Sequence, residues 1–245
     1  MEKDQLIYGI RAIIEAVKAG TNLDKVFVQK DINNELMREL FRTLKSAHIG
    51  FTYVPVEKLQ RLTSFNHQGV VATLAPVSFL TIEQLVETTL EKEKPALFLI
   101  LDQLSDARNL GSIIRTASCT GVDGIILPRQ GSAPINGDTV KTSAGAVFQV
   151  PLCKVDHIKD ALFYLQSCDI SVVAATEKTT NLLYDIDFTG HKAIIMGNEE
   201  KGIHPSLLKM ADELAALPMT GTIASLNVSV ACGAFLYEAV RQRKV

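Results

Sequence analysis

The sequence predicts an α/β protein in which a small N-terminal domain precedes a larger domain built on a mainly parallel sheet. Helical and strand-like segments alternate along nearly all of the 245 residues. Residues 96–102 (ALFLILD) form an almost continuous apolar run, which is typical of a central strand covered on both faces of a parallel sheet. Polar and acidic residues at 79–94 interrupt the alternation. We therefore expect domains at 1–76 and 95–245, joined by a linker at 77–94 that contains a short helix.

The N-terminal domain is expected to be a small α/β sandwich with three helices and three strands. Apolar residues recur at helical spacing over 7–20, where Gly20 would end the helix, and Asn33 or Asn34 would cap the second helix. The expected helices are 7–20, 33–50 and 56–62, and the expected strands are 24–29, 51–55 and 69–75.

The C-terminal domain continues the alternation and predicts an open parallel sheet with helices on both faces. Gly121 would end its first helix, and Ile158, Leu162 and Leu165 give its second helix an apolar face. Basic residues lie at the end of the last helix, where the helix dipole favours them. The expected strands are 96–102, 123–128, 170–176, 192–197 and 213–219, and the expected helices are 109–120, 157–168 and 226–243.

The composition excludes several classes of protein. Hydrophobic residues make up 47% of the chain, which is enough for a core and excludes wholesale disorder. No apolar stretch approaches the about 20 residues of a membrane helix, and the beginning MEKDQLIYG has no apolar region of a secretory signal. The cysteines are far apart without a CxxC pair, which predicts free thiols in a reducing cytoplasm. They are Cys119, Cys153, Cys168 and Cys232.

Charge and histidine spacing limit the partners. A net charge of −2 excludes a strongly basic nucleic-acid binder, so an RNA partner would require a local basic face. The histidines show no HxH or HxxxH spacing and no clustering with cysteine. We therefore expect no metal site.

Ligands of open α/β sheets bind where strands end, so the segments that follow strands form the candidate site. The first, 102–117 (DQLSDARNLGSIIRTA), follows the most apolar strand. Asn109 is placed to cap a helix, and Gly111 permits close backbone approach. Apolar neighbours of Arg115 predict a packed stem and a fixed guanidinium; an ordinary surface arginine is the alternative.

The second segment, 194–205 (IIMGNEEKGIHP), runs from a strand into a tight polar loop between Gly197 and Gly202. It is neither GxGxxG nor a Walker loop, so neither a dinucleotide nor a P-loop triphosphate is indicated. A plain strand-to-helix turn is the alternative interpretation.

The third segment, 217–240, leads from a strand that ends at Pro218 through a loop of small residues into a helix. Ser225 is the expected N-cap of that helix. A loop of this kind offers main-chain N–H and C=O groups to a flat polar ligand such as adenine.

Together, the three segments resemble the three motifs of the SpoU/TrmH branch of the SPOUT superfamily, RNA ribose 2′-O-methyltransferases that depend on S-adenosylmethionine. The motifs resemble N-x-G-x-x-x-R-[ST]-A, a hydrophobic residue before G-x-E-x-x-G, and [IL]-P-M-x-G-x-x-x-S-L-N-V-S-V-A. The matching stretches are Asn109–Ala117, Met196–Gly202 and Leu217–Ala231. One departure is Asn198-Glu199-Glu200, where the family often has Ala or Ser, Glu and Gly.

The N-terminal stretches IYGIRAIIEAV and NHQGVVA resemble the start and end of an L30e-like RNA-binding domain. That domain occurs in the bacterial group that methylates guanosine of 23S ribosomal RNA. The resemblance thus spans nearly the whole chain and implies an L30e-like domain followed by a SPOUT-type α/β-knot domain. The trefoil knot is expected from the resemblance alone, because knots are very rare in proteins.

The resemblance also implies the site, the cofactor and the partners. We expect S-adenosylmethionine as cofactor, RNA as substrate, and a homodimer without metal or membrane. The implied catalytic residues are Arg115, Asn109, Glu199, Ser225 and Asn227. The implied cofactor-binding residues are Thr176, Gly197, Leu217 and Leu226.

Arg115 is the expected activator of the 2′-hydroxyl, and its chemistry limits how it acts. A guanidinium with a pKa above 12 does not serve as a base, so we expect it to donate hydrogen bonds to the developing alkoxide and to hold the adjacent phosphate.

Three alternatives remain. One is a transfer RNA ribose methyltransferase. Another is a non-catalytic RNA-binding protein, whose expected signature, loss of Arg115, Glu199 or Asn227, is missing. The third is a nucleotide-dependent oxidoreductase, which would need a GxGxxG fingerprint that the chain lacks.

Overall fold

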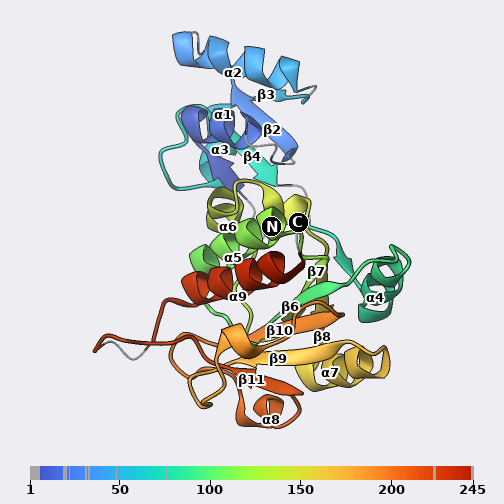
Figure 1. Ribbon diagram of the computed structural model, residues 1–245. Helices are drawn as coiled ribbons and strands as arrows, with labels where there is room; N and C mark the ends of the chain where they lie inside the picture. Colours follow the sequence, from blue (N-terminus) through green and yellow to red (C-terminus); the bar gives the residue numbers. More distant parts are fainter. Residues whose placement is uncertain are drawn as a thin grey trace. The chain divides into compact units, whose positions relative to one another are not determined.

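The computed structural model describes residues 6–18, 21, 23–30, 32, 34–47, 49–74, 77–222 and 225–243. The chain forms two compact units, one from Met1–Val77 with Pro134–Phe148 and the other from Ser78–Ala133 with Gln149–Val245 (Figure 1). The domain boundaries at 76 and 95 stay a prediction.

The first unit contains a sheet that, in the described residues, has four strands in the order β1-β4-β2-β3. β4 is antiparallel to β1 and β2, and β3 is parallel to β2. Helices α1 and α2 bury their apolar residues against one face of the sheet, and Leu59 of α3 packs on the other. The strands are β1 (Leu6–Tyr8), β2 (Leu23–Gln29), β3 (Thr52–Val54) and β4 (Val70–Leu74). The helices are α1 (Ile10–Lys18), α2 (Glu35–Ser46), α3 (Val56–Leu62), α6 (Gly137–Thr142) and the short 3-10 helix η2 (Ala146–Phe148).

The helix expected over 7–20 is wrong at its beginning. Residues Leu6–Tyr8 pair with β4, and Gly9, with a φ of 92°, separates this strand from α1. Pairing with a distant strand overrides the local helical pattern there. Asn34 caps α2 by accepting a hydrogen bond from the Met37 amide, whereas Asn33 and Gly20 lie outside the described residues.

The second unit is built on a sheet that, as far as the chain is described, has seven strands in the order β11-β9-β10-β6-β7-β8-β5. Every neighbouring pair is parallel, as predicted. The strands are β5 (Phe79–Leu80), β6 (Leu97–Leu101), β7 (Gly124–Pro128), β8 (Leu152–Val155), β9 (Ser171–Ala175), β10 (Lys192–Met196) and β11 (Glu213–Ala215). The helices are α4 (Ile82–Leu90), α5 (Ala107–Thr120), α7 (Ile158–Ser167), α8 (Pro205–Leu208) and α9 (Val228–Arg243), with the 3-10 helix η3 (Leu183–Asp185).

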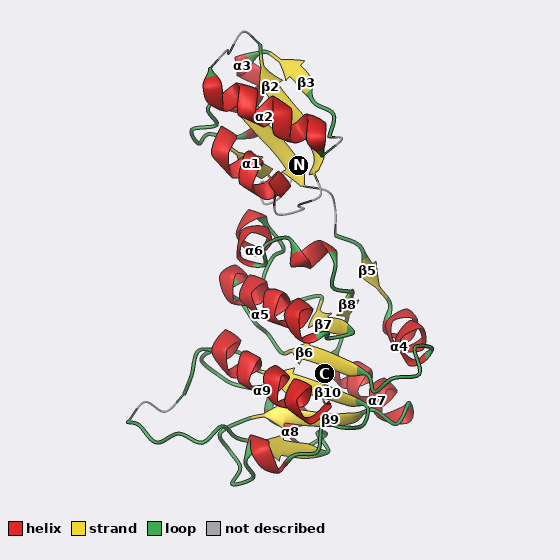
Figure 2. Ribbon diagram, turned by 45° about the horizontal axis from the view of Figure 1, so that its top comes forward, coloured by secondary structure: helices red, strands yellow, loops and turns green. Residues whose placement is uncertain are grey.

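Helices cover both faces of this sheet. On one face, α4, α7 and α8 bury apolar residues against Phe98, Ile100 and Ile195. On the other face, α5 and α9 lie side by side (Figure 2). Covering both faces explains why β6, β7 and β10 are buried at every position.

Two stretches of the second unit hold strands that the sequence pattern did not predict. In the expected linker, β5 pairs with β8, whereas α4 is the short helix expected there and buries Leu85 and Val86 in the core. Between the strand at 123–128 and the helix at 157–168, β8 joins the sheet beside β7. Both additional strands are short, so their alternation is too brief to be distinguished from a loop.

The cysteines are free, and their burial differs. Cys119 is exposed and Cys168 is half-buried, whereas Cys153 and Cys232 are buried. Burial raises the pKa of the Cys153 thiol to about 11 and that of Cys232 to about 12. No helix in the described part of the chain is both long and apolar enough to cross a membrane.

The side chains of Arg243 and Gln242 attach the end of α9, and Gln242 donates to the Ile186 carbonyl and accepts from the Phe188 amide. The half-buried Arg243 donates hydrogen bonds to the carbonyl oxygens of Phe188 (2.9 Å), Pro95 (2.8 Å), Ala96 (3.0 Å) and Gly190 (2.8 Å). Burial lowers the pKa of this guanidinium, because its charge is partly removed from water. Arg243 thus joins the C-terminal helix to the start of β6 and to the segment before β10.

We expect Arg243→Met to lower the free energy of unfolding by about 2–4 kcal/mol, because four carbonyls lose a charged donor while the apolar stem is kept. Thermal and urea unfolding of the full chain measure this. The control is Arg129→Met, which removes an exposed ion pair with Asp156 and should cost less than about 1 kcal/mol. Equal losses for the two variants would contradict the anchoring role.

Candidate active site

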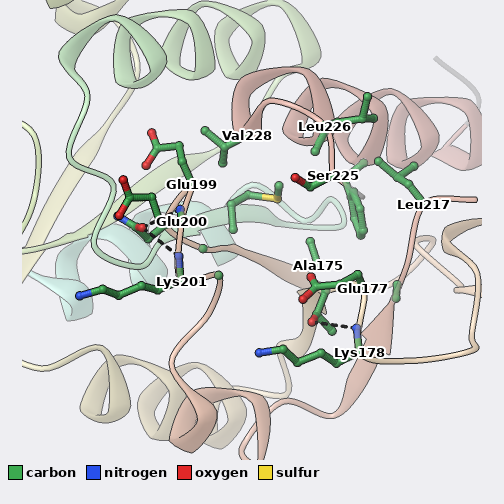
Figure 3. Close-up of a pocket in the computed structure, with 18 of the residues that line it drawn as sticks. Ala175, Glu177, Lys178, Glu199, Glu200, Lys201, Leu217, Ser225, Leu226 and Val228 are labelled. Atoms are coloured by element: carbon green, nitrogen blue, oxygen red, sulfur yellow. Dashed lines mark hydrogen bonds between the residues drawn. The ribbon is translucent and has the colours of Figure 1, made fainter. Parts of the chain in front are cut away.

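A pocket lies where neighbouring strands of the second unit end. The carboxyl ends of β11, β9, β10 and β6 are adjacent in the sheet, so the segments that follow these strands lie at one edge. The pocket has a volume of about 390 Å³ and is lined by residues after β9, β10 and β11 and by the first half of α9. In Figure 3, Glu199 and Glu200 lie on one side of it, and Leu217 and Leu226 lie on the other.

The structure places six of the nine predicted site residues in the lining of this pocket. They include all four residues that we expect to contact the cofactor, together with two of the expected catalytic residues. They are Thr176, Gly197, Leu217, Leu226, Glu199 and Ser225. The other three, Asn109, Asn227 and Arg115, are not among the lining residues.

Two of these three residues are joined to the pocket by hydrogen bonds. The Asn109 side-chain amide donates to Glu199 Oε1 at 2.9 Å, and its oxygen accepts from Asn227 Nδ2 at 3.1 Å. One residue from each of the three motif segments therefore takes part in a single hydrogen-bonded chain. Glu199 and Asn227 are exposed and Asn109 is half-buried, so water competes for these bonds.

Asn109 has this role because another residue caps its helix. We expected Asn109 to be the cap, but α5 begins earlier, and Asp106 accepts hydrogen bonds from the amides of Arg108 and Asn109 at 2.8 Å. A carboxylate at this position also complements the helix dipole. The Asn109 side chain is thereby free to bridge the other two segments.

Arg115 does not match the expectation of a packed stem and a fixed head. It lies in α5, is exposed, and makes no hydrogen bond or ion pair with any described residue. Its neighbours Ile113 and Ile114 are fully buried because they face the sheet, and the helix turn directs Arg115 outward. The single chain therefore presents this guanidinium to solvent.

The loop after β10 requires its first glycine and uses its unusual asparagine. A Cβ atom on Gly197 would lie 2.3 Å from the backbone of Gly202 and Ile203. Asn198 and Gly202 pair through two backbone hydrogen bonds, and Gly202 has a φ of 69°. The Asn198 side chain accepts from the amides of Glu200 and Lys201 and donates to the Gln103 carbonyl at 2.8 Å. The departure from the family pattern at Asn198 thus closes the loop and ties it to the segment after β6.

Asn227 also replaces Ser225 as the residue that caps α9. The Asn227 carboxamide oxygen accepts hydrogen bonds from the Ser229 amide at 2.9 Å and from the Ser229 hydroxyl at 2.6 Å. Ser225 lies before the helix and lines the pocket. The expectation that Ser225 is the cap is therefore wrong.

Several lining residues escaped the sequence reasoning. Among them, Glu177 and Lys178 follow β9, and Glu200, Lys201 and Phe235 lie in the loop after β10 and in α9. Glu177 and Lys178 could have been predicted, because they directly follow a strand and ligands of open α/β sheets bind where strands end. The remaining residues depend on how the loop and α9 fold back over the sheet.

The lining suits a flat base attached to a positively charged group. Leu217, Leu226 and Phe235 supply apolar surface, and the Gly197 loop offers main-chain groups at close range. The carboxylates of Glu177, Glu199 and Glu200 outnumber the ammonium groups of Lys178 and Lys201, so the lining complements positive charge. These features fit S-adenosylmethionine, which has an adenine, an amino group and a sulfonium. Among the described residues, no group of three or more His, Cys, Asp or Glu is arranged to hold a metal.

We expect Gly197→Ala to lower the free energy of unfolding by about 1–3 kcal/mol, because the new methyl group collides with backbone that a rotamer change does not move. Differential scanning calorimetry of the full chain measures this. Gly190→Ala, whose Cβ would meet nothing within 4 Å, is the control and should change stability by less than about 0.5 kcal/mol. A melting temperature for Gly197→Ala equal to that of the control would disprove the packing constraint.

The comparisons with known proteins agree with the site geometry. Residues 96–237 match the SpoU rRNA Methylase family, and residues 6–80 match the family described as RNA 2′-O ribose methyltransferase substrate binding. A putative TrmH family tRNA/rRNA methyltransferase of Staphylococcus aureus (strain MSSA476) is 33% identical over 241 residues, which cover 98% of this chain and 97% of that protein.

Solved structures with bound cofactor have the same fold. The SpoU methyltransferase AviRb from Streptomyces viridochromogenes, in complex with AdoMet, matches with a TM-score of 0.73 and 25% identity over 97% of this chain and 89% of that chain. The AdoMet-bound rRNA methyltransferase from Sinorhizobium meliloti matches with a TM-score of 0.71 and 25% identity over 97% of this chain and 87% of that chain. This chain belongs to the SpoU rRNA methylase family of S-adenosylmethionine-dependent RNA methyltransferases.

Proposed function

We propose that this protein transfers a methyl group from S-adenosylmethionine to the 2′-hydroxyl of a guanosine in 23S ribosomal RNA. The observation that carries this proposal is the hydrogen-bonded chain Glu199–Asn109–Asn227, which is joined through Glu199 to the pocket. The match of residues 6–80 to a substrate-binding family of ribose 2′-O-methyltransferases supports the ribose oxygen as acceptor. The S. meliloti relative, which is described as an rRNA methyltransferase, supports ribosomal RNA.

The protein's contribution to the reaction is orientation and electrostatics. When bound, S-adenosylmethionine supplies a methyl carbon that is electrophilic because it is attached to a positively charged sulfur. Thr176, Gly197, Leu217 and Leu226 hold the cofactor, and the Glu199 carboxylate complements its positive charge. Asn109 and Asn227 keep Glu199 in place, and Ser225 shapes the same wall.

Arg115 is the residue that activates the hydroxyl. Its guanidinium stays protonated, so it donates hydrogen bonds to the developing alkoxide and to the neighbouring phosphate, and the proton passes to the phosphate or to water. Its exposed position and lack of partners among the described residues leave all of its donors available to RNA.

We further propose that the protein acts in the cytoplasm as a homodimer with the family's trefoil knot. α9 buries Cys232, Phe235 and Leu236 in the second unit. It also carries Val230 and Tyr237, whose exposed fraction is 57% each. These two residues are seven positions apart and share one helix face. A second copy of the chain would remove this apolar face from water.

A transfer RNA substrate is the second candidate. The S. aureus relative is named for both tRNA and rRNA, so the relatives leave the RNA class open. The same chemistry and the same residues would serve either substrate, and the distinction comes from an assay with both RNAs.

The first experiment is transfer of labelled methyl from S-adenosylmethionine to unmodified 23S ribosomal RNA and to bulk transfer RNA. Alkali-resistant dinucleotides report 2′-O-methylation. We expect label at one guanosine of the ribosomal RNA. Label in transfer RNA alone would change the substrate. No label in either RNA despite cofactor binding would indicate a ribosomal particle in place of free RNA, and no cofactor binding would favour a non-catalytic RNA-binding protein.

We expect Arg115→Ala to reduce the rate of methyl transfer by about 10²–10³-fold or more without changing the Kd for S-adenosylmethionine, because Arg115 is not part of the pocket lining. Arg115→Lys keeps the positive charge but loses the planar guanidinium with its several fixed donors, so its rate should lie between those of Arg115→Ala and the wild type. Lys209→Ala, at the end of α8, serves as the control. A normal rate for Arg115→Ala would remove this residue from the mechanism.

We expect Val230→Asp to convert a dimer into a monomer, because a carboxylate would be buried without a partner in the apolar interface. Light scattering coupled to size exclusion should give twice the chain mass for the wild type and a single chain mass for the variant. Phe163→Asp, on the exposed side of α7, is the control and should stay dimeric. A monomeric wild type would refute the homodimer.

A further inference from the structure

Two exposed aromatic rings are stacked at one end of the N-terminal sheet. Tyr8 is the last residue of β1, and Phe65 lies in the loop between α3 and β4. Their ring centroids are 5.3 Å apart and their planes differ by 9°. Tyr8 is 36% exposed and Phe65 is 64% exposed, so the stack has a large surface in contact with water. Two adjacent aromatic rings therefore leave apolar surface exposed to water, and exposed apolar surface of this kind can mark a binding site.

Hydrogen bonds connect the segments that carry the two rings. The Gln68 side chain accepts a hydrogen bond from the Ile10 amide at 3.2 Å, and the Gly9 amide donates to the Val70 carbonyl at 3.2 Å. Gln68 has a φ of 51°, a conformation that is unfavourable for a residue other than glycine. The loop is thus fixed in an unfavourable conformation next to the exposed stack, as in a binding site formed before its ligand arrives.

The topology brings positive charge to the same end. β1, β2 and β3 are parallel to one another and β4 is antiparallel to them, so three strands end where β4 begins. α1 begins at this end directly after Tyr8 and Gly9, and Arg11 lies in its first turn. Arg11 is exposed and has no ion pair with any described residue. Arg11 lies at this end of the unit but lines a hollow with Glu35 and Glu39 of α2, so it is not beside the rings.

We propose that the Tyr8–Phe65 stack binds one unpaired nucleobase of the RNA substrate, which stacks on the exposed face of Phe65. This inference rests on the proposed function for the identity of the partner as RNA. A paired base has both faces covered by its neighbours, so the stack selects a loop, bulge or end over a duplex. Both rings lie within residues 6–80, which match a family described as RNA 2′-O ribose methyltransferase substrate binding, and we therefore assign the site to RNA.

The test uses the full chain and a hairpin oligoribonucleotide with 2-aminopurine in its loop, beside a fully paired duplex of the same length. 2-Aminopurine loses fluorescence when it stacks on an aromatic ring. The variants are Phe65→Ala, Phe65→Leu and Phe65→Trp. The control is Phe163→Ala, which removes a phenylalanine of equal exposure (65%) from α7. Thermal melting verifies that each variant is folded.

We expect Phe65→Ala to weaken hairpin binding by about 5- to 100-fold and to abolish the quenching, with little effect on the weaker duplex binding. Phe65→Leu should behave like Phe65→Ala, and Phe65→Trp should restore both signals. Unchanged hairpin affinity in Phe65→Ala, or full binding by Phe65→Leu, would overturn the stacking site. The methyl-transfer assay tests the proposed function independently of this binding assay. A wild-type protein that transfers label while Phe65→Ala binds the hairpin normally would contradict the stacking site and leave the proposed function intact.

Discussion

The parallel arrangement of β11, β9, β10 and β6 is the constraint on which the site depends. Parallel strands end at the same edge, so segments far apart in the chain emerge next to one another. The bridge from Glu199 through Asn109 to Asn227 then joins three of these segments with only two hydrogen bonds. The strands beneath are buried on both faces, so the sheet provides a common base for these loops.

The site combines rigid and adaptable parts. Gly197 and Asn198 hold the loop after β10 through backbone contact and side-chain bonds, and Gly197 has no room for a side chain. Glu199, Asn227 and Arg115 are exposed, so their positions respond to a ligand or to a second chain. A pocket held at its base and open toward solvent suits an enzyme that binds a small cofactor deeply and a large RNA from outside.

The last helix, α9, has one side that packs in the core and one side that is exposed. One side of α9 packs on the second unit and ends at Arg243, whose four hydrogen bonds fix the C-terminal end of the helix. The other side exposes Val230 and Tyr237, and the helix begins directly after Asn227. A partner that covers the exposed side would therefore lie close to the residues that begin the hydrogen-bonded chain.

The sequence by itself determined the fold class, the all-parallel sheet and most element positions in the second unit, because a strand covered on both faces must be apolar throughout. The resemblance of its motifs to those of the SpoU/TrmH family also identified six residues that line the pocket. Tertiary structure alone decided that Leu6–Tyr8 is a strand, that Asp106 rather than Asn109 caps α5, and that Asn227 rather than Ser225 caps α9. In each case several residues have the local chemistry for the role, and contacts with residues distant in the sequence select among them.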